Sequence, residues 1–164
     1  MTLLDDFPFR AGVAKKAVSE LQKWEGPDPA YWCNHGYAIV NPDARGAFSS
    51  NGDIHFWGTQ EGRDGHDLIE WVAGQEWSNG KVGLSGNSWL AIVQWFIAAE
   101  KPPHLAAIAP WEGWYDAYRE DVGRGGIQDF GFCEYVTSKM RGKNRVEDVP
   151  AMIQKYPLIN VYWE

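Results

Sequence analysis

A serine between two apolar stretches is the residue of this chain best placed to do chemistry. Ser88 lies in the sequence Gly86-Asn87-Ser88-Trp89-Leu90-Ala91, after a short apolar run and at the start of a longer one. In a tight strand-to-helix turn, a serine hydroxyl stands at the helix N-terminus, where the dipole favours a developing oxyanion. The backbone N–H of Trp89 would donate one hydrogen bond to that oxyanion. This pattern indicates acyl transfer with Ser88 as the nucleophile.

The same residues leave a structural role for the serine open. Leu90 stands where the pattern Gly-x-Ser-x-Gly has its second glycine. Serine is also common at helix N-caps, where it only satisfies backbone N–H groups. Ser85 is the neighbouring serine, but it falls inside the predicted strand and is the weaker candidate.

Strands and helices are predicted to alternate around Ser88. Apolar runs at residues 37–40, 81–85 and 105–109 are typical of buried parallel strands, and Pro110 is expected to end the third. Residues 13–24 have helical spacing, and a further helix is predicted from Ser88 to about residue 100. After a long loop at 43–62, Asp64 is expected to cap a helix whose apolar face is Leu68, Ile69, Val72 and Ala73. This order predicts an α/β fold, a parallel sheet with crossover helices.

Composition excludes several kinds of partner. A chain of 164 residues allows one domain of ordinary size. The net charge is -7 and no basic run interrupts it, so we expect no nucleic-acid partner. No apolar run is long enough to cross a membrane, and the longest is interrupted by Gln94. The acidic start lacks a signal-peptide pattern, which favours the cytoplasm for the chain as given.

No metal or cofactor is predicted. Cys33, His35, His55 and His66 have spacings that match no zinc or di-metal pattern, and Cys33 and Cys133 are expected to be free, mostly buried thiols. The glycines at 123, 125 and 126 lack the Gly-Lys-Ser/Thr ending of a phosphate loop. Asp43 and Arg45 follow the strand predicted at 37–40, and we interpret them as a structural ion pair or turn.

A resemblance then extends the interpretation. Residues 36–46, with Asp43, Arg45 and Gly46, resemble the strand and loop of the Xaa-Pro dipeptidyl-peptidase and cocaine esterase family of α/β-hydrolases. Residues 61–71 are similar to that family's next helix, and residues 77–90 to its nucleophile segment. Trp89 replaces the usual tyrosine, and Ala91 the usual glycine.

The resemblance implies where the parts of a site lie. Ser88 is the family's nucleophile position, residues 1–110 form a partial α/β-hydrolase domain, and residues 111–164 begin a helical cap. This cap has helix-like stretches at 129–140 and 146–156. Its first rings are expected to line a substrate pocket, or else to pack the cap on the sheet: Trp111, Trp114, Tyr115 and Tyr118.

Other parts of the machinery are missing from the sequence. In this fold the triad follows the chain order serine, acid, histidine, but only His104 follows Ser88, and none follows Asp116, Asp121 or Asp129. There is also no match to the family's second oxyanion donor, a tyrosine, or to one internal strand. We therefore expect a partial, inactive piece of a protein that hydrolyses a small ester or peptide. The alternative is a non-catalytic binding or assembly module that uses the 10 tryptophans; the oligomeric state is left open.

Overall fold

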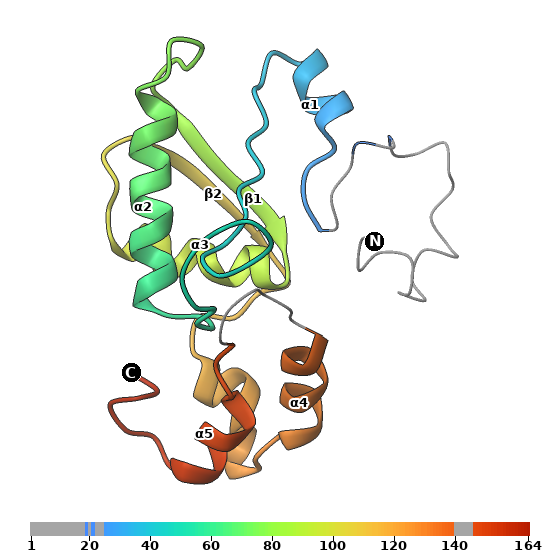
Figure 1. The fold of residues 1–164 in the computed structure, drawn as a ribbon, viewed down its shortest axis with the longest axis vertical. Coiled ribbons are helices and arrows are strands. Elements are labelled where there is room, and N and C mark those ends of the chain that lie inside the picture. Colours follow the sequence, from blue (N-terminus) through green and yellow to red (C-terminus); the bar gives the residue numbers. More distant parts are fainter. Residues whose placement is uncertain (1–18, 20, 22–24, 140–145) are drawn as a thin grey trace.

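The computed structural model describes residues 19, 21, 25–139 and 146–164 (Figure 1). Most of the helix predicted at 13–24 therefore lies outside the described residues. The elements follow one another as α1 (Pro29–Asn34), α2 (Thr59–Ala73), β1 (Val82–Asn87), α3 (Trp89–Ala99), β2 (Leu105–Trp111), the π-helical turn η2 (Tyr118–Val122), the 3-10 turn η3 (Arg124–Gly126), α4 (Phe130–Lys139) and α5 (Val149–Lys155).

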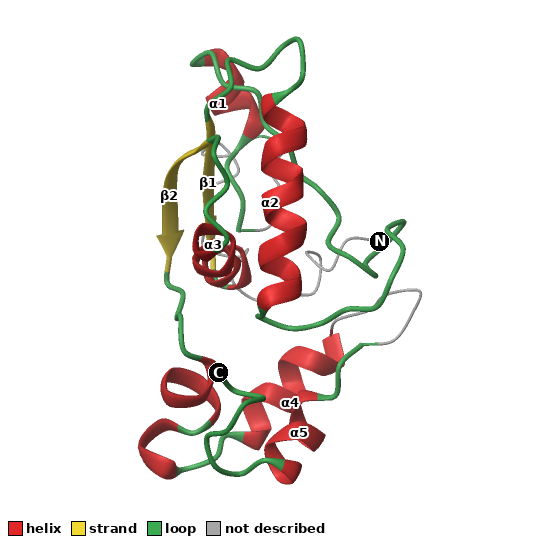
Figure 2. Ribbon diagram, turned by 90° about the vertical axis from the view of Figure 1, so that its left-hand side faces the viewer, coloured by secondary structure: helices red, strands yellow, loops and turns green. Residues whose placement is uncertain are grey.

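Two parallel strands joined by a helix form the centre of the molecule. β1 pairs with β2 in a register that runs from Val82 opposite Leu105 to Asn87 opposite Trp111, and α3 is the connection between them. In Figure 2, α2 and α3 lie on the same side of the two strands. This arrangement confirms the predicted α/β class, and it places Ser88 at the carboxyl end of β1, where functional loops gather in such sheets.

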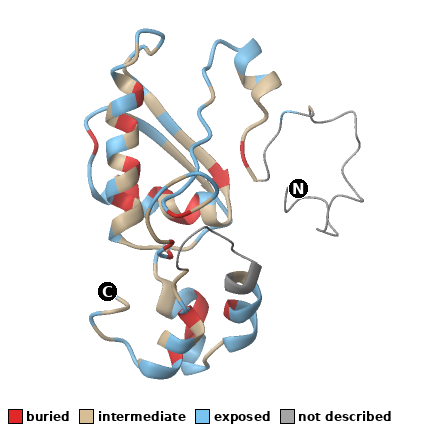
Figure 3. Ribbon diagram, viewed as in Figure 1, coloured by how far each residue is buried: buried red, intermediate tan, exposed pale blue. Residues whose placement is uncertain are grey.

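Small residues let α2 and α3 approach closely. A Cβ added to Gly65 would lie 2.3 Å from Ile97 Cδ1, and one added to Gly62 would lie 2.8 Å from the Phe96 carbonyl oxygen. Buried segments, coloured red in Figure 3, lie along both helices. Ile69 on α2 and Ile97 on α3 are among the buried residues. The glycines thus determine how closely α3, which begins directly after Ser88, packs against α2.

The start of α2 was predicted too late. The helix begins at Thr59, with Gly58 as N-cap, five residues before Asp64. Asp64 accepts hydrogen bonds from Arg45 and Gln60 instead of capping the helix. The ion pair with Arg45 also lowers the pKa of Asp64 and gives Arg45 a structural partner.

The strand predicted at residues 37–40 is wrong. This segment has no strand conformation, and Tyr37 and Val40 are exposed. An apolar run becomes a buried strand only where a neighbouring strand accepts and donates its hydrogen bonds. Among the described residues the only ladder is the one between β1 and β2, so residues 37–40 have no strand beside them.

The third strand continues past Pro110, which was expected to end it. β2 runs to Trp111, and the Trp111 carbonyl oxygen accepts a hydrogen bond from the Ser88 N–H at 3.1 Å. Proline removes one ladder donor but leaves its carbonyl oxygen and extended backbone intact. The bond to Ser88 holds the chain in the sheet for one residue beyond it.

Gln94 is buried for a reason that the sequence did not reveal. Its Oε1 accepts a hydrogen bond from the Ala109 N–H at 3.0 Å, and its Nε2 donates to the Leu90 carbonyl oxygen at 2.7 Å. The side chain is only 1% exposed. The one polar residue inside the apolar helix therefore ties α3 to the backbone of β2.

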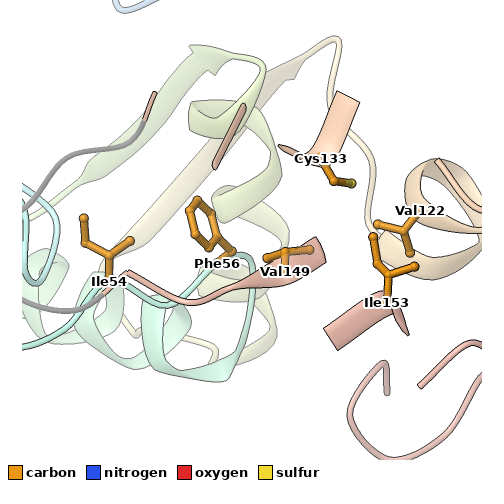
Figure 4. Packing of buried hydrophobic residues seen from close by; sticks show 6 residues of the cluster. All are labelled: Ile54, Phe56, Val122, Cys133, Val149 and Ile153. Atoms are coloured by element: carbon orange, nitrogen blue, oxygen red, sulfur yellow. The ribbon is translucent and has the colours of Figure 1, made fainter. Parts of the chain in front are cut away.

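The cap-side segment, residues 111–164, shares a hydrophobic cluster with the loop before α2. Figure 4 shows the side chains that make up this cluster: Ile54, Phe56, Val122, Cys133, Val149 and Ile153. The Glu147 N–H also donates to the Ile54 carbonyl oxygen at 3.0 Å, next to an isolated bridge between Ile54 and Val146. The predicted boundary at residue 110 remains a prediction, but packing is continuous across it.

The helices predicted in the cap-side segment are present, within tighter bounds. α4 lies inside residues 129–140, and α5 begins at Val149, where Asp148 Oδ1 accepts from the Ala151 N–H at 3.0 Å. Cys133 is free and buried, whereas Cys33 is exposed, contrary to expectation. No helix in the described residues is long and apolar enough to cross a membrane.

Candidate active site

Ser88 has the backbone conformation of a strained turn. Its φ is 55° and its ψ is -121°, a combination that favours glycine and costs a serine free energy. The Ser88 carbonyl oxygen accepts hydrogen bonds from the N–H groups of Ala91 and Ile92, both at 2.9 Å, which hold the residue at the start of α3. Its side chain makes no capping bond to that helix. The structural N-cap role thus does not account for a serine here.

Close packing around Ser88 explains its small neighbours. A Cβ on Gly86 would lie 2.4 Å from Leu90 Cβ, so the strand passes directly beneath the first turn of α3. A Cβ on Gly113 would lie 2.7 Å from Ala91 Cβ, and Ala91 is fully buried. Leu90 therefore takes the space above Gly86, and Gly113 makes room for the methyl group of Ala91.

The backbone N–H of Trp89 is available to a ligand. Within the described part of the chain, no backbone or side-chain acceptor lies on it. It is the first N–H of α3, where the helix dipole adds a partial positive charge. The Trp89 side chain points elsewhere: its Nε1 donates to Glu61 Oε1 at 2.8 Å, and its ring lies 4.9 Å from Phe56 and 5.9 Å from Trp57 between centroids.

Glu61 is a functional candidate that the sequence interpretation missed. Its Oε2 accepts a hydrogen bond from the Trp57 N–H at 2.8 Å, while Oε1 holds Trp89. The pKa of Glu61 is raised to about 7, mainly by burial and to a smaller extent by the carboxylates of Asp64 and Glu147, against the lowering effect of these two bonds. The available signal was a glutamate in the first turn of a helix, reaching back to the N–H that precedes the cap. Starting the helix at Asp64 concealed it.

The four aromatic candidates do not gather at one place. Trp111 is exposed and lines a hollow of about 360 Å³ with Glu25, Gly26, Asn87 and Glu112. Trp114 packs against Trp57, 4.9 Å between ring centroids. Tyr115 is 69% exposed. Tyr118 turns into the cap-side segment, where its hydroxyl donates to the Pro157 carbonyl oxygen at 2.9 Å.

Two of the four aromatic residues are linked to the turn at Ser88 by contacts. The backbone carbonyl oxygen of Trp111 accepts a hydrogen bond from the Ser88 N–H. The Trp114 ring contacts the Trp57 ring, which in turn contacts the Trp89 ring. Tyr118 has the packing role that was the alternative for these rings, because it contacts Trp163 and satisfies its hydroxyl within the segment. A substrate-binding role for all four remains a prediction.

His104 lies at the wrong end of the sheet to act on Ser88. It precedes β2 and bonds through Nδ1 to Glu70 Oε2 at 2.7 Å, an interaction that lowers the pKa of Glu70. Ser88 is level with the other end of that strand, about 20 Å away at the usual rise per residue. Of the later acids, Asp116 pairs with Arg119 and Asp129 with Arg124, whereas Asp121 is buried and its pKa is raised by burial.

The described residues also contain no group of three metal-ligating side chains. His66 pairs with its neighbour Asp67, and His35 Nδ1 bonds to the Tyr31 carbonyl oxygen at 2.8 Å. The roles of Ser88 as nucleophile and of the Trp89 N–H as oxyanion donor remain predictions.

A parallel strand, a serine with positive φ and a helix follow one another here as they do in the nucleophile turn of an α/β-hydrolase. The chain belongs to the X-Pro dipeptidyl-peptidase (S15) family, which residues 2–153 match. Known structures agree, since a CocE/NonD family hydrolase from Staphylococcus aureus superimposes with a TM-score of 0.83 at 37% identity, over 89% of this chain and 27% of that one.

The names of similar proteins include both esterase and dipeptidyl-peptidase. Cocaine esterase from Rhodococcus sp. (strain MB1 Bresler) is 39% identical over 135 residues, 76% of this chain and 23% of the relative. A protein from Bacillus anthracis named putative Xaa-Pro dipeptidyl-peptidase is 28% identical over 153 residues, 74% of this chain and 26% of the relative. The chain thus spans about a quarter of the length of these relatives.

Proposed function

We propose that the protein to which this chain belongs hydrolyses ester or amide bonds through an acyl-Ser88 intermediate. The observation that carries the proposal is the conformation of Ser88, with a positive φ at the head of α3 and no capping bond from its hydroxyl. Strain of this kind is retained where it serves a function. The family match adds that similar proteins carry the names esterase and dipeptidyl-peptidase.

The reaction assigns one role to each group at the turn. Ser88 Oγ attacks the substrate carbonyl carbon while its proton passes to a general base, and the Trp89 N–H donates to the resulting oxyanion. The C–O or C–N bond to the leaving group then breaks as that group takes the proton. Water, deprotonated by the same base, releases the acid product and restores the Ser88 hydroxyl.

The base and its orienting carboxylate come from elsewhere in the protein, in this proposal. His104 is the only histidine after Ser88, and its place beside Glu70 at the far end of β2 does not suit the role. Removing the base of such a triad costs on the order of a million-fold in turnover. The 164-residue chain alone should therefore not turn over substrate.

A fluorophosphonate probe tests both parts of the proposal. The full-length protein should be labelled, Ser88→Ala should abolish the labelling, and the matched control Ser85→Ala on β1 should leave it unchanged. The 164-residue chain, shown to be folded, should stay unlabelled. Labelling that survives Ser88→Ala in the full-length protein would assign the nucleophile to another residue. A full-length protein that stays unlabelled would favour a binding module, for which the exposed rings of Trp71, Trp77 and Trp95 are the candidate surface.

Substrate class can be assigned with the same variants. An activated ester and an Xaa-Pro anilide represent the two activities that the relatives' names contain. Hydrolysis of either one that disappears in Ser88→Ala supports the proposal and identifies the bond cleaved. If the probe labels the protein but neither compound is hydrolysed, the substrate must carry an acyl group of a different shape from those two.

A further inference from the structure

Two carboxylates hold two consecutive backbone N–H groups beside the candidate nucleophile. The Phe56 N–H donates to Glu147 Oε2 at 3.0 Å, and the Trp57 N–H donates to Glu61 Oε2 at 2.8 Å. The remaining oxygen of each carboxylate is also used. Glu61 Oε1 accepts from Trp89 Nε1 at 2.8 Å, and Glu147 Oε1 accepts from the Tyr162 hydroxyl at 2.7 Å. We name Glu61 and Glu147 the carboxylate clamp.

The clamp connects the cap-side segment to the start of α3. Glu147 and Tyr162 belong to the cap-side segment, Glu61 to the first turn of α2, and Trp89 is the first residue of α3. The rings of Phe56 and Trp57, whose backbone N–H groups the two carboxylates hold, both contact the Trp89 ring. Residues 56 and 57 are therefore in direct contact with Trp89, the residue that follows Ser88.

We propose that Glu61 is a positioning residue: it fixes the Trp89 side chain, and through it the backbone N–H beside Ser88, and the clamp relates that position to the cap-side segment. The inference rests on the proposed function for its catalytic consequence, but the link between Glu61 and Trp89 is testable without it. Positioning of this kind matters because an oxyanion donor contributes fully only when it is held in place before the reaction.

Packing alone does not explain a charged residue here. Glu61 faces the carboxylates of Asp64 on α2 and Glu147 on the cap side, so its charge is opposed from two directions. Arg45 and the exposed His55 act on Asp64, and α3 contributes no charged side chain. A glutamine would fill the same volume without this repulsion, but it has one acceptor oxygen for two N–H donors. Only the carboxylate presents a separate acceptor oxygen to each of Trp57 and Trp89.

Proton uptake gives the proposal a signature. When Glu61 is protonated, one of its carboxyl oxygens becomes an O–H donor and faces an N–H group that needs an acceptor. One of the two hydrogen bonds is therefore lost. Because the pKa of Glu61 is raised to about 7, that change falls near neutral pH. Replacing Glu147 by glutamine removes one opposing charge and should move the change to lower pH.

The test is the indole N–H resonance of Trp89 in the full-length protein labelled with ¹⁵N-tryptophan. The resonance is assigned by its loss in Trp89→Phe. It should titrate with a midpoint near neutral pH in the unmodified protein, at lower pH in Glu147→Gln, and not at all in Glu61→Gln. Glu70→Gln is the matched control, since Glu70 is on the same helix but pairs with His104, and it should leave the midpoint unchanged. A Trp89 resonance that does not titrate, or that titrates unchanged in Glu61→Gln, overturns the proposal.

Kinetics supply the second arm. Glu61→Gln should lower kcat by roughly tenfold to a hundredfold with little change in KM, below the loss measured for removing an oxyanion donor outright. In the Trp89→Phe background the same substitution should have little further effect, because the bond it acts through is already gone. Full additivity would overturn the positioning role. If Ser88→Ala retains activity, the proposed function fails, while the resonance still decides whether Glu61 holds Trp89.

Discussion

The Ser88 N–H donates to the Trp111 carbonyl oxygen at 3.1 Å, so the candidate nucleophile is fastened to the last residue of the neighbouring strand. Trp111 is also where the chain leaves the sheet for the cap-side segment. A movement at the root of that segment therefore reaches Ser88 through one backbone bond. The same exit lies beside the hollow that Trp111 lines with Asn87.

Strain at Ser88 should be measurable as stability. Glycine adopts a φ of 55° and ψ of -121° without a Cβ clash, so Ser88→Gly should be more stable than Ser88→Ala by about 1 kcal/mol. Both variants lose the hydroxyl, so the comparison isolates the backbone term. Chemical denaturation of the two variants measures the difference, and equal stabilities would mean that the turn is relaxed in solution.

The contact between Gly86 and Leu90 should resist enlargement. Gly86→Ala places a methyl group 2.4 Å from Leu90 Cβ and should cost about 1–3 kcal/mol of unfolding free energy. Leu90→Gly in the same molecule would remove the opposing Cβ. The double variant should therefore lose less stability than the sum of the losses of the two single variants, and melting temperatures measure all three losses. Strict additivity would show that the strand and helix are further apart.

Gln94 should be more important for stability than its place in an apolar helix suggests. Gln94→Leu leaves the Ala109 N–H without its acceptor in a buried position, and should cost about 1–3 kcal/mol. Gln94→Glu keeps an acceptor but adds a buried charge, so it should lose stability more strongly at alkaline than at acidic pH. Denaturation at two pH values checks both statements; a neutral Gln94→Leu would contradict the first.

Stability should depend on pH through Glu61 in the direction opposite to that of Asp64 and Asp116. Its pKa is raised from 4.5 to about 7, so between these values the folded protein keeps a proton that the unfolded chain has lost. The stability due to that proton is fully present below about pH 4.5 and is lost as pH rises through about 7. Asp64 and Asp116, whose pKa values are lowered, contribute the reverse slope.

The difference between the unmodified protein and Glu61→Gln isolates this effect. Glu61→Gln should gain relative stability as pH rises across that window, because glutamine never ionises. Unfolding free energies at a series of pH values give the curve. A difference that does not change with pH would mean that Glu61 is ionised normally in the folded state.

Local sequence patterns were sufficient to predict an element where its packing partners are its neighbours in the chain. β1, α3 and β2 are consecutive in the chain and pair with one another, so their apolar runs predicted both their existence and the turn at Ser88. Residues 37–40 have an equally apolar sequence, yet they form no strand, because an apolar pattern does not specify what lies beside it. Pro110 shows the converse. It disfavours a strand, yet it lies inside β2 because the next residue, Trp111, accepts a hydrogen bond from the Ser88 N–H.

The sequence predicted the site residues that are adjacent in the chain, but not the contacts between residues far apart in it. Ser88 and Trp89 follow from one hexapeptide, whereas Glu61 meets Trp89 over a separation of 28 residues and Glu147 meets Phe56 over 91. Neither contact has a sequence spacing that would reveal it without a structure. Trp111, Trp114, Tyr115 and Tyr118 are close in sequence but face different surroundings, because the chain turns from strand to helical segment between them.

The hydrophobic cluster that joins Ile54 and Phe56 to Val122, Val149 and Ile153 has a consequence for engineering this family. If residues 111–164 were replaced by the equivalent segment of a relative, that segment would pack against side chains that complement another sequence. The exchangeable unit is therefore discontinuous: residues 53–57 would have to travel with the graft, although more than fifty residues of the recipient lie between the two pieces in sequence.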